Sequence, residues 1–192
     1  DVQNTNDGYL TIKSIENIAG GAGNDTIYGN DSNNTLSGGY GNDTLWGRGG
    51  NNTLIGGLNG YQIVLGAIVL GTTYSFALEG KTVSYIAKAG DTKESVLKEL
   101  ENSFNSNNIT NSYIVNDGEK LYIETDNIIS SNTNLTATAE TFIDIADYSL
   151  NPYNGIKVDL SKATEQVNNG NGGFDTLIGI EQIKGSNFAD TF

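Results

Sequence analysis

The stretch "GGAGNDTIYGNDSNNTLSGGYGNDTLWGRGGNNTLI", residues 20–55, repeats with a period of nine residues. In each nonamer the seventh residue is threonine and the eighth is a large aliphatic residue. These positions are Thr26, Ile27, Thr35, Leu36, Thr44, Leu45, Thr53 and Leu54. A fixed period of this kind is typical of a solenoid. We therefore predict that each nonamer is a glycine-rich turn followed by a very short strand. Its aliphatic side chain points inward and is buried only when neighbouring repeats stack.

The composition of the whole chain agrees with a mainly β fold. The 192 residues include 25 Gly and 1 Pro, and 36% are hydrophobic while 17% are charged. Gly, Asn and Thr are weak helix formers, whereas Thr, Ile, Tyr and Val favour strands. The regular recurrence of aliphatic residues argues against a disordered chain.

Charge and side-chain inventory narrow the kind of partner. The formal net charge is −13, so nucleic acid and anionic membrane surfaces would be repelled. The sequence contains no Cys and no His, which excludes a thiol nucleophile, a Ser-His-Asp triad and a zinc site of Cys and His. Oxygen ligands remain plentiful, and they favour a hard cation such as Ca²⁺. No apolar run is long enough to span a membrane, so we expect no membrane insertion.

The segments GGAGND (20–25) and GGYGND (38–43) resemble the consensus GGxGxDxUx of the RTX, or hemolysin-type, calcium-binding repeats, where U is a large aliphatic residue. That family occurs in secreted bacterial adhesins, S-layer proteins and toxins. The resemblance implies a right-handed parallel β-roll in which two nonamers make one turn. It also implies that calcium lies between turns that stack on the same edge.

On a roll of this kind, residues eighteen apart share an edge, so Asp25 stacks on Asp43. The resemblance implies that these two carboxylates and the surrounding backbone carbonyls bind calcium. The carbonyl candidates are Gly20, Gly21, Ala22, Gly23, Gly38, Gly39, Tyr40 and Gly41. Glycine at these positions permits positive φ and lets carbonyl groups converge on an ion.

The opposite edge carries Asn34 and Asn52 in place of aspartate. Two interpretations stay open: a calcium site that Asp31 completes, or an asparagine ladder without metal. On the first edge the next loop is GGLNGY (56–61), in which Tyr61 takes the sixth position. We therefore expect strong calcium binding in this block to be limited to about one ion.

The C-terminal segment 177–192 aligns without gaps to residues 12–27, with Asp190 matching Asp25. Together with the preceding GNGGFDTL, this makes Asp175 and Asp190 secondary calcium candidates. Asp147 and Asp159 are two further carboxylates in the segment before it, and we interpret them as turn caps in preference to ligands.

Between the two repeat-like parts the nonamer period is absent. Residues 61–70, 73–78 and 82–87 are predicted strands, with a hairpin turn at Glu79-Gly80. Residues 91–104 are predicted as an amphipathic helix with Asp91 as N-cap. The predicted order is an N-terminal RTX β-roll block (1–59), a small α+β insertion (60–128) and a C-terminal β-rich RTX-like block (129–192).

These observations predict a non-enzymatic, calcium-binding structural module of a large secreted bacterial surface protein, of adhesin or S-layer type. The alternative is a secretion and folding module of a toxin or hydrolase that leaves the cell by type I secretion. Partners beyond calcium are neighbouring copies or a cell-surface glycan. We expect exposed aromatic side chains at Tyr40 and Trp46, with Trp46 as a contact residue.

Overall fold

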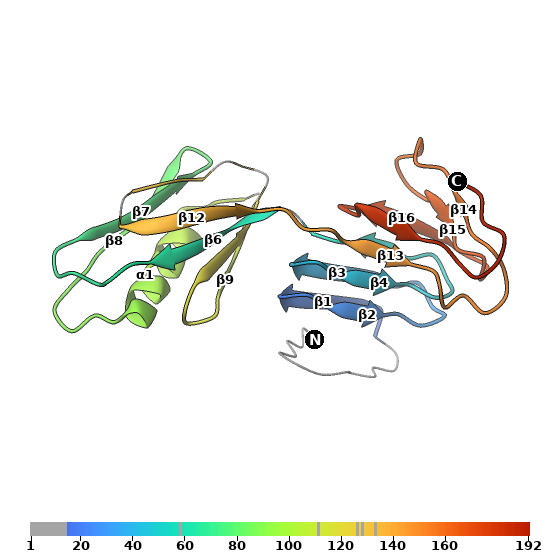
Figure 1. Ribbon diagram of the computed structural model, residues 1–192, viewed down its shortest axis with the longest axis horizontal. Coiled ribbons are helices and arrows are strands. Elements are labelled where there is room, and N and C mark those ends of the chain that lie inside the picture. The colour runs from blue at the N-terminus through green and yellow to red at the C-terminus, as the bar shows by residue number, and fades with distance from the viewer. Residues whose placement is uncertain (1–14, 58, 111, 126, 128, 133) are drawn as a thin grey trace. The chain divides into compact units, whose positions relative to one another are not determined.

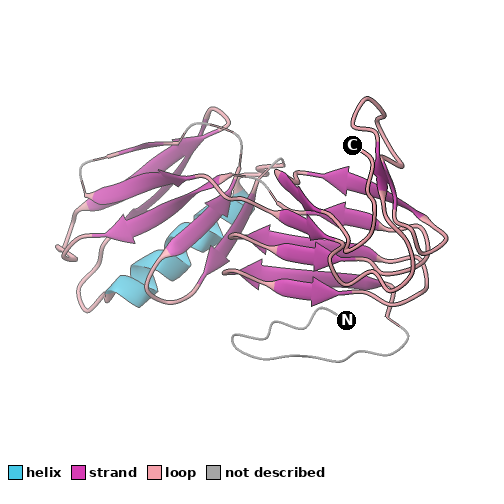
Figure 2. Cartoon of the chain, turned by 45° about the vertical axis from the view of Figure 1, so that its right-hand side comes forward, coloured by secondary structure: helices cyan, strands magenta, loops and turns pink. Residues whose placement is uncertain are grey.

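The computed structural model describes residues 15–57, 59–110, 112–125, 127, 129–132 and 134–192. Residues 1–14 of the predicted N-terminal block lie outside this range. The described chain is mainly β, as predicted, and it divides into two compact units (Figure 2). The repeat unit comprises the described residues up to Gly57 and from Phe142 onward. The central unit comprises the described residues between them.

Two sheets of mostly parallel strands form the repeat unit (Figure 1). The order in the first sheet is β1-β3-β5-β16-β15-β14, and in the second it is β17-β13-β4-β2. Among the described strands of this unit, only the pairs that include β15 are antiparallel. The strands of the first sheet are β1 (Asn17–Ala22), β3 (Thr35–Tyr40), β5 (Thr53–Ile55), β16 (Phe174–Ile178), β15 (Val167–Asn168) and β14 (Lys157–Val158). Those of the second are β2 (Thr26–Tyr28), β4 (Thr44–Trp46), β13 (Ile145–Asp147) and β17 (Gln182–Lys184).

The pairing register follows the nonamer period. Thr26 pairs with Thr44 in the second sheet, and Thr35 pairs with Thr53 in the first. Successive strands of one nonamer pair therefore alternate between the sheets, and residues eighteen apart lie side by side.

The aliphatic residues at the eighth nonamer position form the core of the repeat unit. Leu36, Leu45 and Leu54 are fully buried, and Ile27 in the first turn is nearly so. Ala146, Tyr148, Ile156 and Val167 extend this core toward the C-terminus. Burial of these side chains depends on the turns above and below, as expected for a stacked repeat.

The central unit lies, in the sequence, between the two parts of the repeat unit. The chain leaves after β5 and Gly57 and returns at Phe142, after which β13 pairs in parallel with β4. This return point differs from the boundary predicted at residue 128. β12 (Leu135–Glu140) pairs with β6 (Gly60–Leu65) over six residues, and its Leu135 belongs to the core of the central unit.

Antiparallel strands and one described helix build the central unit (Figure 2). One sheet has the order β12-β6-β10-β9 and the other β11-β7-β8. The remaining strands are β6 (Gly60–Leu65), β7 (Thr73–Leu78), β8 (Lys81–Ile86), β9 (Tyr113–Asn116), β10 (Leu121–Glu124) and β11 (Ser130–Ser131). Strand β6 ends at Leu65, five residues before the predicted end of the strand at 70. The hairpin turn between β7 and β8 lies where predicted, with Glu79 and Gly80 both at positive φ.

Helix α1 (Lys93–Ser106) begins two residues later than predicted. Thr92, and not Asp91, is the N-cap, because the Thr92 side chain accepts a hydrogen bond from the Ser95 amide in a capping box. Asp91 instead closes the preceding turn by accepting a hydrogen bond from the Lys88 amide. The helix buries the predicted face, which consists of Val96, Leu97, Leu100 and Phe104. Among the described residues, no helix has the length and apolar character needed to cross a membrane.

Candidate metal centre

The loops that join β1 to β2 and β3 to β4 are held close together by glycine. Gly23 and Gly41 have φ values of 128° and 134°, a region that side-chain-bearing residues rarely adopt. A Cβ atom on Gly41 would lie 2.1 Å from the Gly23 carbonyl oxygen, and one on Gly39 would lie 2.4 Å from that of Gly21. Only glycine therefore allows the carbonyl groups of one turn to face the backbone of the next at this separation.

A ladder of acidic side chains runs along this edge of the repeat unit. The amide of Asp25 donates to Asp43 Oδ1 (2.7 Å), and the amide of Asp43 donates to Asp144 Oδ1 (2.8 Å). The amide of Asp144 in turn donates to Glu181 Oε2 (2.9 Å). We call Asp25, Asp43, Asp144 and Glu181 the acidic edge. Asp43 and Asp144 are buried, while Asp25 is half-buried.

The structure places Asp25 and Asp43 on adjacent turns, and it corrects the expectation for the third position. Tyr61 lies in β6 of the central unit and does not continue the edge. Asp144 takes that place, because Ile145 and Ala146 pair with Thr44 and Leu45. The sequence signal for Asp144 was weak. The nonamer that begins at Gly56 lacks its second half, and "DIAD" (144–147) supplies an acidic residue two positions before a small buried one.

The acidic edge offers oxygen atoms in a cradle that a side chain would fill. A Cβ on Gly20 would lie 2.3 Å from the Gly38 carbonyl oxygen and 2.4 Å from Asp25 Oδ2. A Cβ on Gly38 would lie 2.0 Å from Asp43 Oδ2. The described residues contain no group of three or more acidic, His or Cys side chains arranged to hold a metal. A cation here would therefore take the carboxylates of Asp25 and Asp43 together with backbone carbonyls. This donor set fits Ca²⁺, which prefers six to eight oxygen ligands.

The other backbone carbonyls that were predicted as metal ligands lie beside Asp25 and Asp43. Gly20, Gly21 and Ala22 form the end of β1, and Gly38, Gly39 and Tyr40 form the end of β3, with Gly21 opposite Gly39 and Ala22 opposite Tyr40. The Tyr40 side chain is buried against Phe142, with ring centroids 4.5 Å apart, so the expectation of an exposed Tyr40 is wrong. Its carbonyl accepts the amide of Gly23 (2.7 Å) and thereby ties the two loops together.

The opposite edge is a hydrogen-bonded ladder of amide groups. The amide of Asn34 donates to Asn52 Oδ1 (2.9 Å), and Asn52 Nδ2 donates to Asp175 Oδ1 (2.9 Å). We call Asn34, Asn52 and Asp175 the amide edge. This arrangement contains the asparagine ladder of one of the two interpretations, and a calcium site completed by Asp31 stays a prediction. Asp31 is exposed and lies in a surface hollow beside Arg48.

The Asp175 carboxylate is enclosed by hydrogen-bond donors of the protein. Its carboxylate accepts Asn52 Nδ2, Asn169 Nδ2 (2.9 Å) and the Tyr148 hydroxyl (2.9 Å). Burial raises the pKa of Asp175, against the lowering effect of these donors. Burial and the nearby Asp175 charge raise the pKa of Tyr148 well above its ordinary value. In this structure the Asp175 carboxylate orders three buried donors, and its calcium role stays a prediction.

Three further carboxylates also serve local structure. Asp190 accepts hydrogen bonds from the Ser186 hydroxyl (2.6 Å) and the Ile156 amide (2.8 Å), and these donors outweigh burial and lower its pKa. Asp147 forms an ion pair with Lys184 at 2.8 Å. Asp159 caps the turn at Ser161, as the sequence suggested. The Asp190 loop keeps the repeat geometry, since a Cβ on Gly185 would lie 2.3 Å from Asp190 Oδ2.

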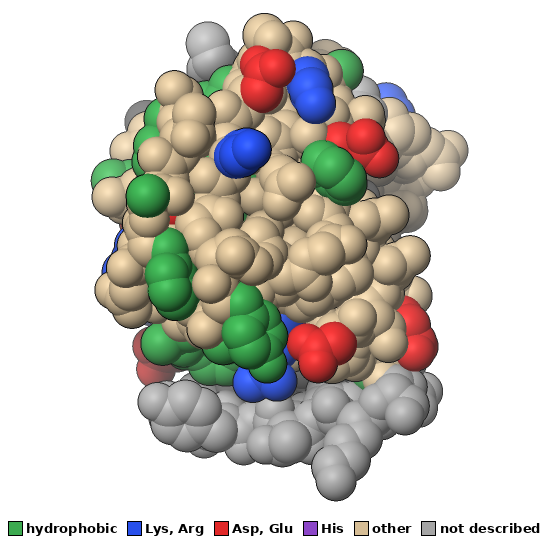
Figure 3. Space-filling model, turned by 90° about the vertical axis from the view of Figure 1, so that its right-hand side faces the viewer, with side chains coloured by type: hydrophobic (Ala, Val, Ile, Leu, Met, Phe, Trp, Pro, Cys, Tyr) green, Lys and Arg blue, Asp and Glu red, His purple; other side chains and the backbone are tan. Residues whose placement is uncertain are grey.

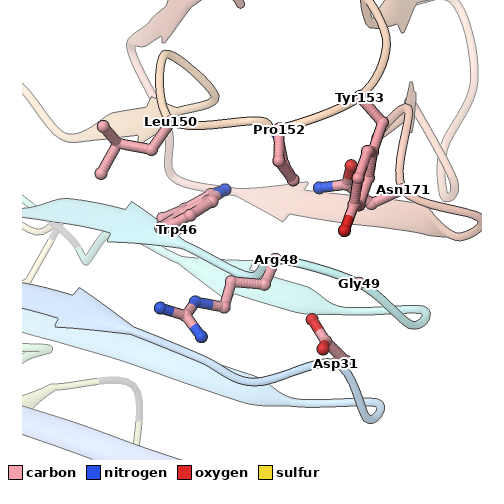
Figure 4. A pocket seen from close by; sticks show the side chains of 8 residues that line it. All are labelled: Asp31, Trp46, Arg48, Gly49, Leu150, Pro152, Tyr153 and Asn171. Carbon is pink, nitrogen blue, oxygen red and sulfur yellow. The ribbon is translucent and has the colours of Figure 1, made fainter.

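A hollow of about 460 Å³ lies in the repeat unit (Figure 4). Trp46 is buried, contrary to expectation, but its ring lines the hollow, with the Arg48 guanidinium 5.0 Å from the ring centroid. Tyr153 is 73% exposed and borders the same space. The lining residues are Asp31, Trp46, Arg48, Gly49, Leu150, Pro152, Tyr153 and Asn171.

A parallel repeat that stacks one carboxylate per turn beside glycine-lined carbonyls defines a metal-binding repeat with oxygen ligands. The comparison with protein families agrees with this class. Residues 14–39 and 28–60 match the family model of the RTX calcium-binding nonapeptide repeat, which spans four copies. These segments are therefore RTX nonapeptide repeats, as the motif indicated, and repeats of this family bind Ca²⁺. The comparison with curated proteins gave no match.

Proposed function

We propose that the protein is a calcium-binding, non-enzymatic structural module of a large secreted bacterial surface protein, of adhesin or S-layer type. In this proposal the repeat unit is a right-handed parallel β-roll and the central unit is a domain inserted into it. The observation that carries the proposal is the pairing of Asp25 with Asp43 across adjacent turns, beside a cradle that only glycine permits.

The physical role of calcium follows from the acidic edge. Carboxylates on adjacent turns repel each other, and the repulsion is strongest where burial excludes water, as at Asp43. On the side of the repeat unit seen in Figure 3, most of the surface is backbone or side chains that are neither charged nor hydrophobic, and acidic side chains are scattered. The buried carboxylates of the acidic edge are better placed to bind a shared ion than the scattered acidic side chains on that face. Binding an ion between the turns turns a repulsive stack into a cross-link and couples metal binding to folding.

The proposed location is extracellular. Extracellular calcium modules typically bind with Kd values of about 10⁻⁴–10⁻³ M, so the repeat unit would stay loose in the cytoplasm and fold after export. The runner-up is a calcium-dependent folding module of a type I secreted toxin or hydrolase. A catalytic domain in the same gene would favour that alternative, whereas further structural repeats would favour the surface protein.

A calcium titration followed by far-UV circular dichroism tests the proposal. We expect the wild-type protein to gain β signal with calcium. The variant Asp25→Asn/Asp43→Asn should need at least tenfold more calcium, because it loses both carboxylates of one site. The matched control is Glu94→Gln/Glu99→Gln, which removes the same charge from the exposed face of α1. A wild-type protein that is fully folded in chelator and indifferent to calcium would contradict the proposal.

For the glycan among the proposed partners, the hollow at Trp46 and Tyr153 is the best-suited surface. Sugars stack on aromatic rings and hydrogen-bond to carboxylate, guanidinium and amide groups. Here these groups are the exposed ring of Tyr153 and the side chains of Asp31, Arg48 and Asn171. Binding to a glycan array should be lost in Tyr153→Ala, and equal binding by wild type and variant would exclude this surface.

A further inference from the structure

The nonamer that begins at Gly56 is completed by residues that follow the central unit in the sequence. The amide of Gly39 donates to the Gly56 carbonyl (3.0 Å), which keeps the first part of this nonamer in register with the turn before it. The amide of Ile145 donates to the Asp43 carbonyl (2.8 Å), which restores the register when the chain returns. The two parts therefore form one interrupted repeat, which we call the split nonamer: Gly56-Gly57 and residues 142–147.

The split nonamer closes in the same way as the uninterrupted ones. A Cβ on Gly56 would lie 2.6 Å from Asp144 Oδ2, compared with 2.0 Å for Gly38 and Asp43 and 2.4 Å for Gly20 and Asp25. In each of these three nonamers the sixth-position carboxylate thus folds back onto the first glycine. For Asp144 that glycine precedes the central unit in the sequence, whereas Asp144 follows it. The contact therefore forms only when the segments before and after the central unit lie in the same turn of the repeat.

Asp144 also repeats the contact between turns that Asp43 makes. Asp144 Oδ1 accepts the Asp43 amide at 2.8 Å, and Asp43 Oδ1 accepts the Asp25 amide at 2.7 Å. Both members of the second pair are buried, with exposures of 0% for Asp43 and 2% for Asp144. Two buried carboxylates on adjacent turns are costly as anions, and a shared divalent cation offsets that cost.

We propose that Asp43 and Asp144 form a second calcium site, which the split nonamer completes. The proposal rests on the proposed function, because it requires that the repeat unit binds calcium. Its ligands are the two carboxylates and the carbonyl groups of the Gly38–Gly41 and Gly56–Gly57 segments. Asp43 then serves both sites, and the second ion fixes the points where the chain leaves and re-enters the repeat unit.

The test counts calcium ions by isothermal titration calorimetry on the full chain. We expect Asp144→Asn to bind one ion fewer than wild type, or to bind one ion at least tenfold more weakly. The matched control, Asp159→Asn, makes the same change at an exposed turn cap of the same unit and should keep the wild-type count. Hydrogen exchange provides a second readout, in which calcium should slow the amides of Gly56 and Ile145 in wild type but not in Asp144→Asn.

The outcomes separate the two proposals. A wild type that binds calcium while Asp144→Asn binds the same number of ions with the same affinity overturns the second site and leaves the proposed function standing. A wild type that binds no calcium overturns both. Should Asp144→Asn fail to fold, Asp144→Glu decides, because it keeps the charge: one weakened ion supports the site, and an unchanged titration overturns it.

Discussion

Gly38 is required for the space it leaves and not for its backbone angles. Its φ lies outside the left-handed region, but a Cβ there would meet Asp43 Oδ2 at 2.0 Å and Asp43 Cγ at 2.5 Å. These atoms belong to a buried side chain within a packed loop, so they cannot move aside at low cost. A methyl group at this position would push the carboxylate away from the carbonyls that face it.

We therefore predict that Gly38→Ala lowers the unfolding free energy at saturating calcium by about 1–3 kcal/mol, the usual range for overpacking. Calcium affinity should fall at least tenfold, because Asp43 is displaced. The control is Gly66→Ala, where the added Cβ would meet only the Asn134 carbonyl oxygen at 3.8 Å. Urea unfolding and calorimetry measure both effects. If the two variants behave alike, the cradle at Gly38 does not hold the carboxylate in place.

Single residues also show how far the sequence predicts the candidate site. The nonamer period is enough to pair Asp25 with Asp43, because residues that share an edge are separated by a fixed number of positions. The role of Asp175 was out of reach, since it depends on Tyr148 and Asn169, which no period relates to it. A ligand and a hydrogen-bonded structural carboxylate differ in the donors around them, and those donors come from tertiary structure.

The short strands were predictable because each has a local cause. The Thr-aliphatic pairs place β2, β4 and β5 at the expected positions, and the hairpin at Glu79-Gly80 follows from its turn residues. The start of α1 does not follow from local pattern alone, because Asp91 and Thr92 are both good N-caps. Each has a polar residue three positions on, Glu94 for Asp91 and Ser95 for Thr92, and the structure forms the reciprocal hydrogen bonds between Thr92 and Ser95.

The return of the chain at β13 was not predictable from local pattern. Its sequence, IAD, has alanine where the other repeats have a large aliphatic residue. β13 takes its place in the sheet by pairing with β4, which lies about a hundred positions earlier in the sequence. Tyr61 was assigned to the acidic edge because counting along the chain assumes that the repeat continues, whereas the fold resumes it at Phe142.

The two units differ in what stabilises them. Among the described residues, fifteen buried hydrophobic side chains form the core of the central unit, including Tyr74, Phe76 and Phe104. Eight form the core of the repeat unit, mostly one aliphatic residue per strand. The central unit therefore has apolar burial of its own. The repeat unit depends more on the stacking of its turns and on relief of the repulsion between the carboxylates of its acidic edge. Each bound ion adds about 2.7 kcal/mol when calcium is at one hundred times its Kd.

We accordingly predict that calcium removal unfolds one unit before the other. In chelator, amides of β3, β4 and β5 should lose protection from hydrogen exchange, while those of β7, β8 and β10 keep it. The reason is that the second set is held by a hydrophobic core that contains none of the acidic edge. Hydrogen exchange of the full chain with mass spectrometry, with and without calcium, measures both units in one sample. Loss of protection in both units together, or in neither, would show that the two units do not differ in their dependence on calcium.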